Sequence, residues 1–225
     1  MAAQNPFELP GPTDRISIMG HTGSGKTQFA AFMLSHAPLD RMPYIIVDYK
    51  GDELLNDIPY LREIGYKDRP KEPGLYIIHP RPDEQEQMEQ FLWNIWERGK
   101  TGLYVDEAYM LPNAGPTNRG AYVSILTQGR SKRIPVMSLT QRPRDVTRFH
   151  FTEANFYSIF HLQDKTDRKR VMEFVPANLE HRLPRFHSFY HRVKDQHTIG
   201  LRPVPDGDTI LERFSDRLRP KHKLV

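Results

Sequence analysis

Residues 14–27 read DRISIMGHTGSGKT, in which a short run of alternating apolar and polar residues leads into a glycine-rich segment. The run from Asp14 to Met19 predicts a β-strand. The apolar spacing from Lys26 to Ala37 predicts a helix that Pro38 ends. Between them, residues 20–27 match the pattern G-x-x-x-x-G-K-[ST]. A strand, a glycine loop and a helix in this order form the arrangement in which that pattern binds phosphate.

Each position of this phosphate loop (P-loop) has a chemical reason for its residue type. Glycines let backbone N–H groups curl around phosphate oxygens without a Cβ in the way, and the following helix points its positive end at the anion. Lys26 is expected to reach the β- and γ-phosphates, and the Thr27 hydroxyl to ligate Mg²⁺. The predicted nucleotide-binding residues are Gly20, His21, Thr22, Gly23, Ser24, Gly25, Lys26, Thr27 and Gln28.

A second, acidic motif ends a later apolar run, where residues 102–107 read GLYVDE. P-loops of this type work with a carboxylate at the end of a neighbouring strand, which holds Mg²⁺. We expect Asp106 to hold the ion through water, and Glu107 to orient and deprotonate the attacking water. The alternative interpretation is that the two carboxylates only cap the next segment.

Other P-loop classes fit the sequence less well. Residues 48–51 (DYKG) match the D-x-x-G of GTPases, but no N-K-x-D guanine motif follows, and the L-S-G-G-Q signature of transporters is absent from the sequence. Small-molecule kinases seldom need an adjacent Asp–Glu pair, because their nucleophile is the hydroxyl of the substrate. The motifs therefore favour a nucleotide hydrolase that uses ATP and Mg²⁺.

Apolar runs alternate with helical patterns along most of the chain. Further strands are predicted at 43–47, 75–78, 103–105, 134–139, 155–162 and 185–193. Further helices are predicted from a cap at Asp83 through Trp96, near 121–130 and at 164–175. This alternation favours an α/β fold with a mostly parallel central sheet flanked by helices. We expect an N-terminal arm at 1–13, one domain at 14–200 and a basic, proline-containing C-terminal tail at 201–225.

Charge is distributed unevenly along the 225 residues. The net charge is +4, but residues 1–110 carry −6 and residues 111–225 carry +10 when histidine is left uncounted. A basic half favours a polyanionic partner, with nucleic acid the leading candidate, although a solvated basic surface would give the same composition. The sequence has no cysteine, no recognisable signal peptide and no apolar run near the ~18 residues that span a membrane, so we expect no direct membrane insertion.

Three further stretches carry a family resemblance: VDYKGD at 47–52, QGRSKRI at 128–134 and SLTQRP at 138–143. Together with the two nucleotide motifs they resemble the FtsK/HerA superfamily of ring-forming DNA translocases, over about residues 14–175. The resemblance implies a RecA-like P-loop fold of the ASCE class. The chain is far shorter than cellular members and lacks a membrane region and a separate DNA-reading domain. It is therefore similar to the genome-packaging ATPases of tailless, internal-membrane (tectivirus-like) double-stranded DNA viruses.

The resemblance also implies roles for individual residues. Gln141 matches a polar sensor at a strand tip, which would contact the γ-phosphate or the attacking water. Arg130 matches the position from which such rings offer an arginine finger to the neighbouring subunit, with Arg133 and Arg119 as rivals. A finger of this kind contributes roughly 10³–10⁵ in rate, because it neutralises charge in the transition state.

The implied partners are double-stranded DNA, further copies of the chain in a ring, expected to be a hexamer, and capsid or portal-vertex proteins. The implied locations are the packaging vertex of the virion and the host cytoplasm. DNA contacts to phosphate are predicted for Arg119, Lys132, Arg133 and Arg144, and the loop at 111–120 would reach the channel of the ring.

Several functions stay open on the sequence. The leading one is an ATP-driven motor that packages a viral double-stranded genome into a preformed shell. A second is an ATPase for filamentous phage assembly or plasmid DNA transfer. A third is a P-loop kinase of a small molecule, and a fourth is a DNA-binding protein that uses ATP only as a structural ligand. Stimulation of ATP hydrolysis by DNA separates the first from the last two.

Overall fold

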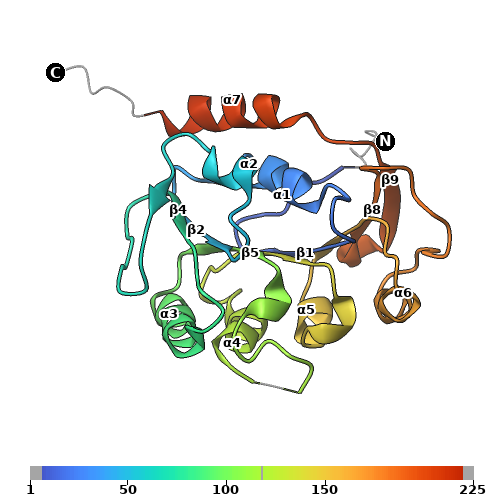
Figure 1. The fold of residues 1–225 in the computed structure, drawn as a ribbon, viewed down its shortest axis with the longest axis horizontal. Coiled ribbons are helices and arrows are strands. Elements are labelled where there is room, and N and C mark those ends of the chain that lie inside the picture. Colours follow the sequence, from blue (N-terminus) through green and yellow to red (C-terminus); the bar gives the residue numbers. More distant parts are fainter. Residues whose placement is uncertain (1–6, 118, 220–225) are drawn as a thin grey trace.

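A nine-stranded sheet forms the centre of the computed structural model, which describes residues 7–117 and 119–219 (Figure 1). The strands are β1 (Arg15–Met19), β2 (Pro43–Asp48), β3 (Arg62–Glu63), β4 (Gly74–Ile78), β5 (Gly102–Asp106), β6 (Val136–Thr140), β7 (Phe156–Ile159), β8 (Ser188–Arg192) and β9 (His197–Leu201). Their order across the sheet is β3-β4-β2-β5-β6-β1-β7-β8-β9. Pairing is parallel from β3 to β7, and β8 and β9 continue the sheet as antiparallel strands. The predicted mostly parallel α/β sheet is confirmed.

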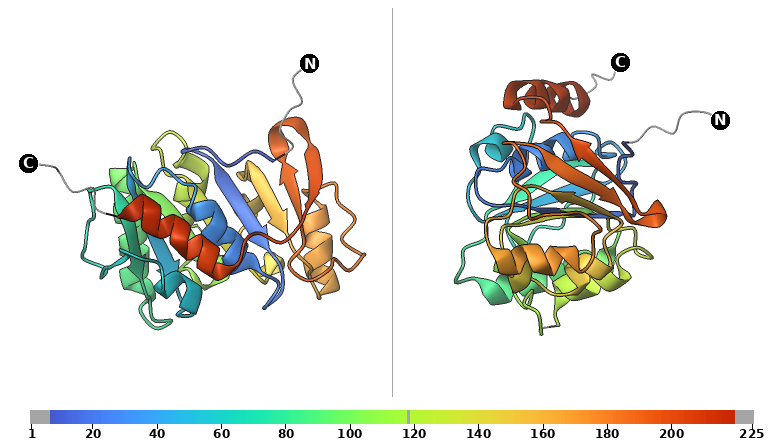
Figure 2. Two further views of the ribbon diagram at one scale, coloured as in Figure 1. Left: turned by 90° about the horizontal axis from the view of Figure 1, so that it is seen from above. Right: turned by 90° about the vertical axis from the view of Figure 1, so that its right-hand side faces the viewer.

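Helices cover both faces of this sheet (Figures 1 and 2). One face carries α1 (Lys26–Leu34), α2 (Glu53–Asn56) and α7 (Gly207–Leu218). The other carries α3 (Gln85–Arg98), α4 (Ala121–Gln128), α5 (Phe149–Thr152) and α6 (Lys165–Met172).

The central strands are apolar on both of their faces, because each face is covered. Ile46 of β2 packs into the core beneath α1, whereas its neighbours Ile45 and Val47 pack into the core on the α3 and α4 side. Side chains alternate across a strand, so a strand buried on both sides must be apolar along its whole length. The runs PYIIV and GLYV in the sequence have this property, which makes them recognisable as buried strands.

The boundaries of three predicted helices need correction, and one of them, expected at 164–175, is α6 and ends at Met172. The helix expected from a cap at Asp83 has Glu84 at its N-cap position, and the Asp83 carboxylate instead pairs with Arg81 at 2.9 Å. The turn that closes from Glu84 N–H to the Arg81 carbonyl, at 3.1 Å, delays the start of the helix. The helix expected to run to Ala37 ends at Leu34. The apolar stripe of α3 is buried as expected, with Trp96 only partly so.

The stretch expected to be a C-terminal tail, 201–225, begins at the last residue of β9 and contains the helix α7. The Asp206 carboxylate caps α7 by accepting a hydrogen bond from the Thr209 N–H at 2.9 Å, and Ile210 and Phe214 are buried in the core beneath α1. Arg217 also donates to the backbone carbonyl of Ser35, just past α1. Residues 207–218 therefore pack on the helix that follows the P-loop.

Residues 1–6 and 220–225, at the two ends of the chain, lie outside the described residues. Asn118 of the loop at 111–120 does so too. The described part of the predicted arm is attached to β8: Tyr190 donates to the Glu8 carbonyl at 2.7 Å, and Arg192 donates to the Glu8 carboxylate at 3.1 Å. None of the helices in the described ranges is long and apolar enough to cross a membrane.

Candidate nucleotide-binding site

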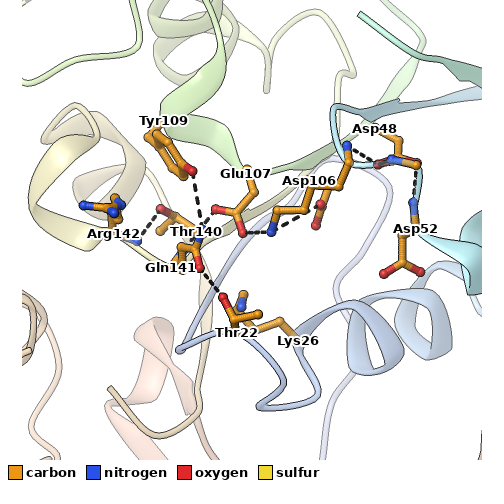
Figure 3. Close-up of polar contacts among 12 residues, drawn as sticks. Thr22, Lys26, Asp48, Asp52, Asp106, Glu107, Tyr109, Thr140, Gln141 and Arg142 are labelled. Atoms are coloured by element: carbon orange, nitrogen blue, oxygen red, sulfur yellow. Dashed lines mark hydrogen bonds and ion pairs between the residues drawn. The ribbon is translucent and has the colours of Figure 1, made fainter. Parts of the chain in front are cut away.

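The sheet order brings the two nucleotide motifs to one edge. The P-loop follows β1 and the Asp106–Glu107 pair ends β5, and β6 lies between these two strands. The register pairs Met19 with Thr140, so Gln141 at the tip of β6 stands between the two motifs (Figure 3). Asp106 was predicted to lie on the strand next to the P-loop strand β1, but its strand, β5, is the second one from β1. The strand between them, β6, carries the predicted sensor Gln141 at its tip.

The backbone of the P-loop depends on glycine at specific points. Gly23 and Gly25 have φ values of 74° and 100°, in the left-handed region that favours glycine, and Gly25 is the N-cap residue of α1. At Gly20 the limit is space, because an added Cβ would lie 2.5 Å from the Phe160 Cβ and 2.7 Å from the Ser24 Oγ. These positions let the loop turn tightly between β1 and α1.

Lys26 lies across this loop. Its side chain is buried, and its Nζ donates to the His21 carbonyl at 3.0 Å. Burial lowers the pKa of Lys26, an effect opposed by the charge of Glu107 and reinforced by that of Lys50. A buried ammonium with one backbone partner is well suited to accept phosphate oxygens as further partners.

Asp106 is a buried carboxylate with unusual surroundings. Neither of its oxygens has a hydrogen-bond partner among the described residues, and Lys50 Nζ lies 3.9 Å from Oδ2. Burial raises its pKa to about 7, and the nearby charges of Glu107 and Asp48 act in the same direction. Hard cations such as Mg²⁺ prefer oxygen ligands, so this unpartnered carboxylate fits a magnesium ion or its bound water. Thr27, the second predicted ligand, lies in the first turn of α1.

Glu107 is held in a defined orientation. It is fully buried, and its backbone has φ 60° and ψ 70°, a left-handed conformation that is uncommon for a residue other than glycine. Its Oε2 accepts from the Gln141 N–H at 3.2 Å, and its Oε1 accepts from Lys50 Nζ. The carboxylate therefore points at the tip of β6, towards the P-loop.

Gln141 links the two motifs through its side-chain amide (Figure 3). Its Oε1 accepts from the Thr22 hydroxyl of the P-loop at 2.5 Å, and its Nε2 donates to the Tyr109 hydroxyl at 3.4 Å, two residues past Glu107. A change at either motif would move this amide. The predicted sensor is thus brought into the site.

Lys50 belongs to this site, although its role is not evident from the sequence. The Asp48 carboxylate accepts backbone hydrogen bonds from Lys50, Gly51 and Asp52 at 2.9–3.0 Å, which fixes a tight turn after β2. Asp48 also pairs with Asp106 in the register of β2 and β5, so this turn carries Lys50 to Glu107. Burial works against the charge on Lys50, but the hydrogen bond and charge of Glu107 outweigh it and raise its pKa.

The predicted arginine finger lies far from this site. Arg130 is exposed in the turn that precedes the amino end of β6, with Lys132 and Arg133 beside it. The Lys132 carbonyl accepts from the Lys100 N–H at 2.8 Å, just before the amino end of β5. The P-loop stands at the opposite, carboxyl ends of these strands. Arg130 is therefore separated from its own P-loop by the full length of the strands, from their amino ends to their carboxyl ends.

The four predicted DNA contacts do not share one surface. Lys132 and Arg133 lie at the amino edge of the sheet, whereas Arg144 lines a cleft beside the P-loop together with His21 and Gln141. The Arg144 N–H donates to the Asp167 carboxylate at 3.0 Å. Arg119 is exposed near the end of the loop at 111–120.

That loop is tied to the fold at its start. Leu111 and Ala114 are buried, and the Ala114 carbonyl accepts from the Thr147 N–H at 2.7 Å. The part free to reach outward is therefore shorter than the sequence suggested.

Comparison with known proteins shows the family of the chain. No family model matches the chain. The chain is 42% identical over 219 residues to the DNA packaging ATPase P9 of Enterobacteria phage PRD1, a match that covers 92% of this chain and 95% of the phage protein. The chain belongs to the P9 family of DNA packaging ATPases. The resemblance to viral genome-packaging ATPases drawn from the sequence is confirmed.

Solved structures show the same fold at much lower identity. The genome packaging NTPase B204 from Sulfolobus turreted icosahedral virus 2, in complex with AMPPCP, matches with a TM-score of 0.68 and 19% identity, over 87% of this chain and all of that chain (100%). The pCW3 conjugation coupling protein TcpA with ATPγS matches with a TM-score of 0.60 and 13% identity, over 89% of this chain and 64% of that one. The P9-family chain thus has the predicted P-loop NTPase fold.

Proposed function

We propose that this P9-family chain is an ATP-hydrolysing motor that moves double-stranded DNA into a preformed viral capsid. The observation that carries the proposal is the convergence of four functional groups at one edge of the sheet: the P-loop, the unpartnered Asp106 carboxylate, the inward-turned Glu107 and the bridging Gln141. This is the set that hydrolysis of a nucleoside triphosphate requires. The family relationship supplies the cargo, because the phage relative is a DNA packaging ATPase.

Each residue has a chemical task in this proposal. The P-loop amides and Lys26 bind the phosphates, and Lys26 withdraws charge from the β- and γ-oxygens. Thr27 and Asp106 would hold Mg²⁺, which neutralises charge on the phosphates when bound. Glu107 orients the attacking water and takes its proton, and the Gln141 amide positions that water or the γ-phosphate.

Assembly into a ring would complete the site. Because Arg130 stands at the edge of the sheet opposite its own P-loop, it can serve as an arginine finger only towards the nucleotide of a neighbouring copy. A closed ring, for which we propose six copies, would give every nucleotide one such arginine. Lys132 and Arg133 at the amino edge, and Arg119 of the loop at 111–120, would contact DNA phosphates in the channel. Arg144 lies at the opposite edge, beside the P-loop, and would not face that channel.

The partners and location follow from packaging. The motor would act at the packaging vertex of the virion, where capsid or portal-vertex proteins recruit it from the host cytoplasm. The domain at 14–200 would carry the ATPase activity together with α7, whose Ile210 and Phe214 lie in its core, and the arm at 1–13 would be an extension. The likeness to a conjugation coupling protein lies below 25% identity and carries the fold alone, so it does not favour a transfer function.

The direct test is ATP hydrolysis by the purified chain with and without long double-stranded DNA at low salt. DNA should stimulate turnover, and Glu107→Gln should lower kcat by about 10²–10⁴-fold, the contribution of a positioned general base. Glu97→Gln, an isosteric change of an exposed glutamate in α3, should leave turnover unchanged. DNA-independent hydrolysis, or phosphate transfer to a small hydroxyl compound, would instead support the kinase function.

A further inference from the structure

A small apolar slot opens beside the P-loop, next to Gly25. Its walls are Gln28 from α1, Phe160 after β7, Phe186 before β8, and Pro203 and Val204 after β9. The enclosed part of the slot is only about 10 Å³, and most of the 210 Å³ of empty space at this point lies in its open mouth. None of the groups assigned above to hydrolysis or DNA binding lines it, apart from the P-loop itself and Gln28.

The order of the strands gives this slot a place along a bound nucleotide. On one side of β1 stand β6 and β5, whose tips carry Gln141, Asp106 and Glu107. On the other side stand β7 and β8, next to which lie Phe160 and Phe186. Because the γ-phosphate must face the groups that hydrolyse it, the phosphate chain leads from β5 and β6 across the P-loop. Its other end, which bears the nucleoside, leaves towards β7 and β8.

Phe186 is the feature of the slot that core packing does not explain. Its side chain is 36% exposed, although it is a large apolar residue, and its backbone has φ 63°, in the left-handed region. The guanidinium of Arg185 lies 4.5 Å from the ring centroid and supports the ring. A Cβ added at Gly25 would lie 2.9 Å from the Phe186 Cδ1, so the ring borders the P-loop directly.

The opposite wall of the slot is tied to the P-loop helix. Gln28 Nε2 donates to the Pro205 carbonyl at 2.7 Å, which anchors the segment that includes Pro203 and Val204 to the first turn of α1. The slot is therefore built from three separate segments that meet at the phosphate site. The enclosed part is too small for a ring, so a flat, aromatic ligand would lie in the open mouth, against the exposed ring of Phe186.

We propose that the mouth of this slot binds the nucleobase of ATP, with the exposed ring of Phe186 as the stacking surface. The inference rests on the proposed ATPase function and names the part of the site that holds the nucleoside. Stacking accepts the π-face of any base, so Phe186 would supply affinity for the nucleoside without strong selection between purines.

The test compares a ligand that has a base with one that lacks it. The dissociation constants of ATP and of inorganic tripolyphosphate are measured by calorimetry for the wild-type chain and for Phe186→Ala. Base–aromatic stacking predicts that Phe186→Ala weakens ATP binding about 5- to 150-fold. Binding of tripolyphosphate should not change. Tyr60→Ala is the matched control, because Tyr60 is also exposed, at 48%, and also has a positive φ of 61°, but lies outside the slot.

A second variant fills the slot in place of emptying it. Val204→Trp should weaken ATP binding and leave tripolyphosphate binding intact, while Phe186→Trp should retain ATP binding. Equal losses for both ligands in Phe186→Ala would mean that Phe186 only supports the P-loop, and would overturn the inference. Unchanged ATP affinity in Phe186→Ala and Val204→Trp, beside normal hydrolysis, would overturn the inference alone. A wild-type chain that binds neither ligand would overturn the proposed function with it.

Discussion

Replacing Asp106 with asparagine should stabilise the fold at pH 8 while it abolishes ATP hydrolysis. Asp106 is buried, its oxygens have no hydrogen-bond partner in the described part of the chain, and Glu107 and Asp48 place further negative charge nearby. Only Lys50, at 3.9 Å, and Lys26 favour its charge. A carboxylate in this position serves metal binding at a cost to stability, and the neutral amide removes that cost.

The size of the effect follows from the pKa of Asp106. Burial raises this pKa from 3.8 to about 7. At about 1.36 kcal/mol per pKa unit, ionised Asp106 lowers the free energy of unfolding by roughly 4 kcal/mol. Because the pKa of Asp106 is raised in the folded state, the roughly 4 kcal/mol of stability that belongs to its protonated form is fully present below about pH 3.8. That stability is lost as pH rises through about 7. The unpartnered amide in the Asp106→Asn chain would itself cost about 1–3 kcal/mol, so a net gain of about 1–3 kcal/mol is expected at pH 8.

Urea unfolding in EDTA, at pH 5.5 and pH 8, measures both chains without bound Mg²⁺. The advantage of Asp106→Asn should be about 2 kcal/mol smaller at pH 5.5, where Asp106 of the wild type is protonated in the folded state. Asp83→Asn, which alters a carboxylate that is 66% exposed, should change stability by less than about 0.5 kcal/mol at either pH. An Asp106→Asn chain that is less stable than the wild type at pH 8, or an advantage that does not vary with pH, would refute the reasoning.

Three further substitutions test separate contacts. Gly20→Ala would force a Cβ to within 2.5 Å of the Phe160 Cβ, so it should abolish tight ATP binding and cost about 1–3 kcal/mol of stability. Gly200→Ala, with no atom within 4 Å of the added Cβ, should do neither. Nucleotide titration measures the binding, and urea unfolding measures the stability. Gln141→Ala removes the link between Thr22 and Tyr109 and should lower kcat about 10²-fold in steady-state assays, with little change in ATP affinity. The control Gln163→Ala, at an exposed position, should keep wild-type turnover. Equal kcat values in the two variants would mean that Gln141 has no catalytic role. Phe214→Ala should lower the free energy of unfolding in urea by about 3–5 kcal/mol, because Phe214 is buried. Glu212→Ala, on the exposed side of α7, should leave it nearly unchanged. A loss below about 1 kcal/mol for Phe214→Ala would mean that α7 is not part of the core.

The nucleotide motifs and the buried strands could be predicted from sequence because both depend on local pattern. The P-loop needs glycines, Lys26 and Thr27 at fixed spacing, and a strand buried on two faces must be apolar throughout. The helix α7 also had a local signal: Asp206 can cap it, and Ile210, Phe214 and Leu218 recur every four residues. The prolines at 203 and 205 and the high charge of the segment obscured that signal.

The contacts that complete the site could not be read from the sequence, because they depend on strand order. The pairing of Lys50 with Glu107 follows from the register of β2 against β5, which joins residues 57 positions apart. Lys132, Arg133 and Arg144, all predicted to contact DNA, are close in the sequence, but β6 separates Arg144 from the other two. Five residues of strand, at about 3.3 Å each, place Arg133 and Arg144 at opposite edges of the sheet.

Movement along DNA is the central claim, and displacement of a third strand from a double-stranded track measures it most directly. A labelled triplex-forming oligonucleotide is bound near one end of a long duplex, and its release is followed after ATP is added. The wild-type chain should displace the third strand only when ATP is present. The Glu107→Gln chain should bind the duplex but leave the third strand in place. Vigorous ATP hydrolysis in the presence of the duplex, with the third strand left in place, would contradict the account.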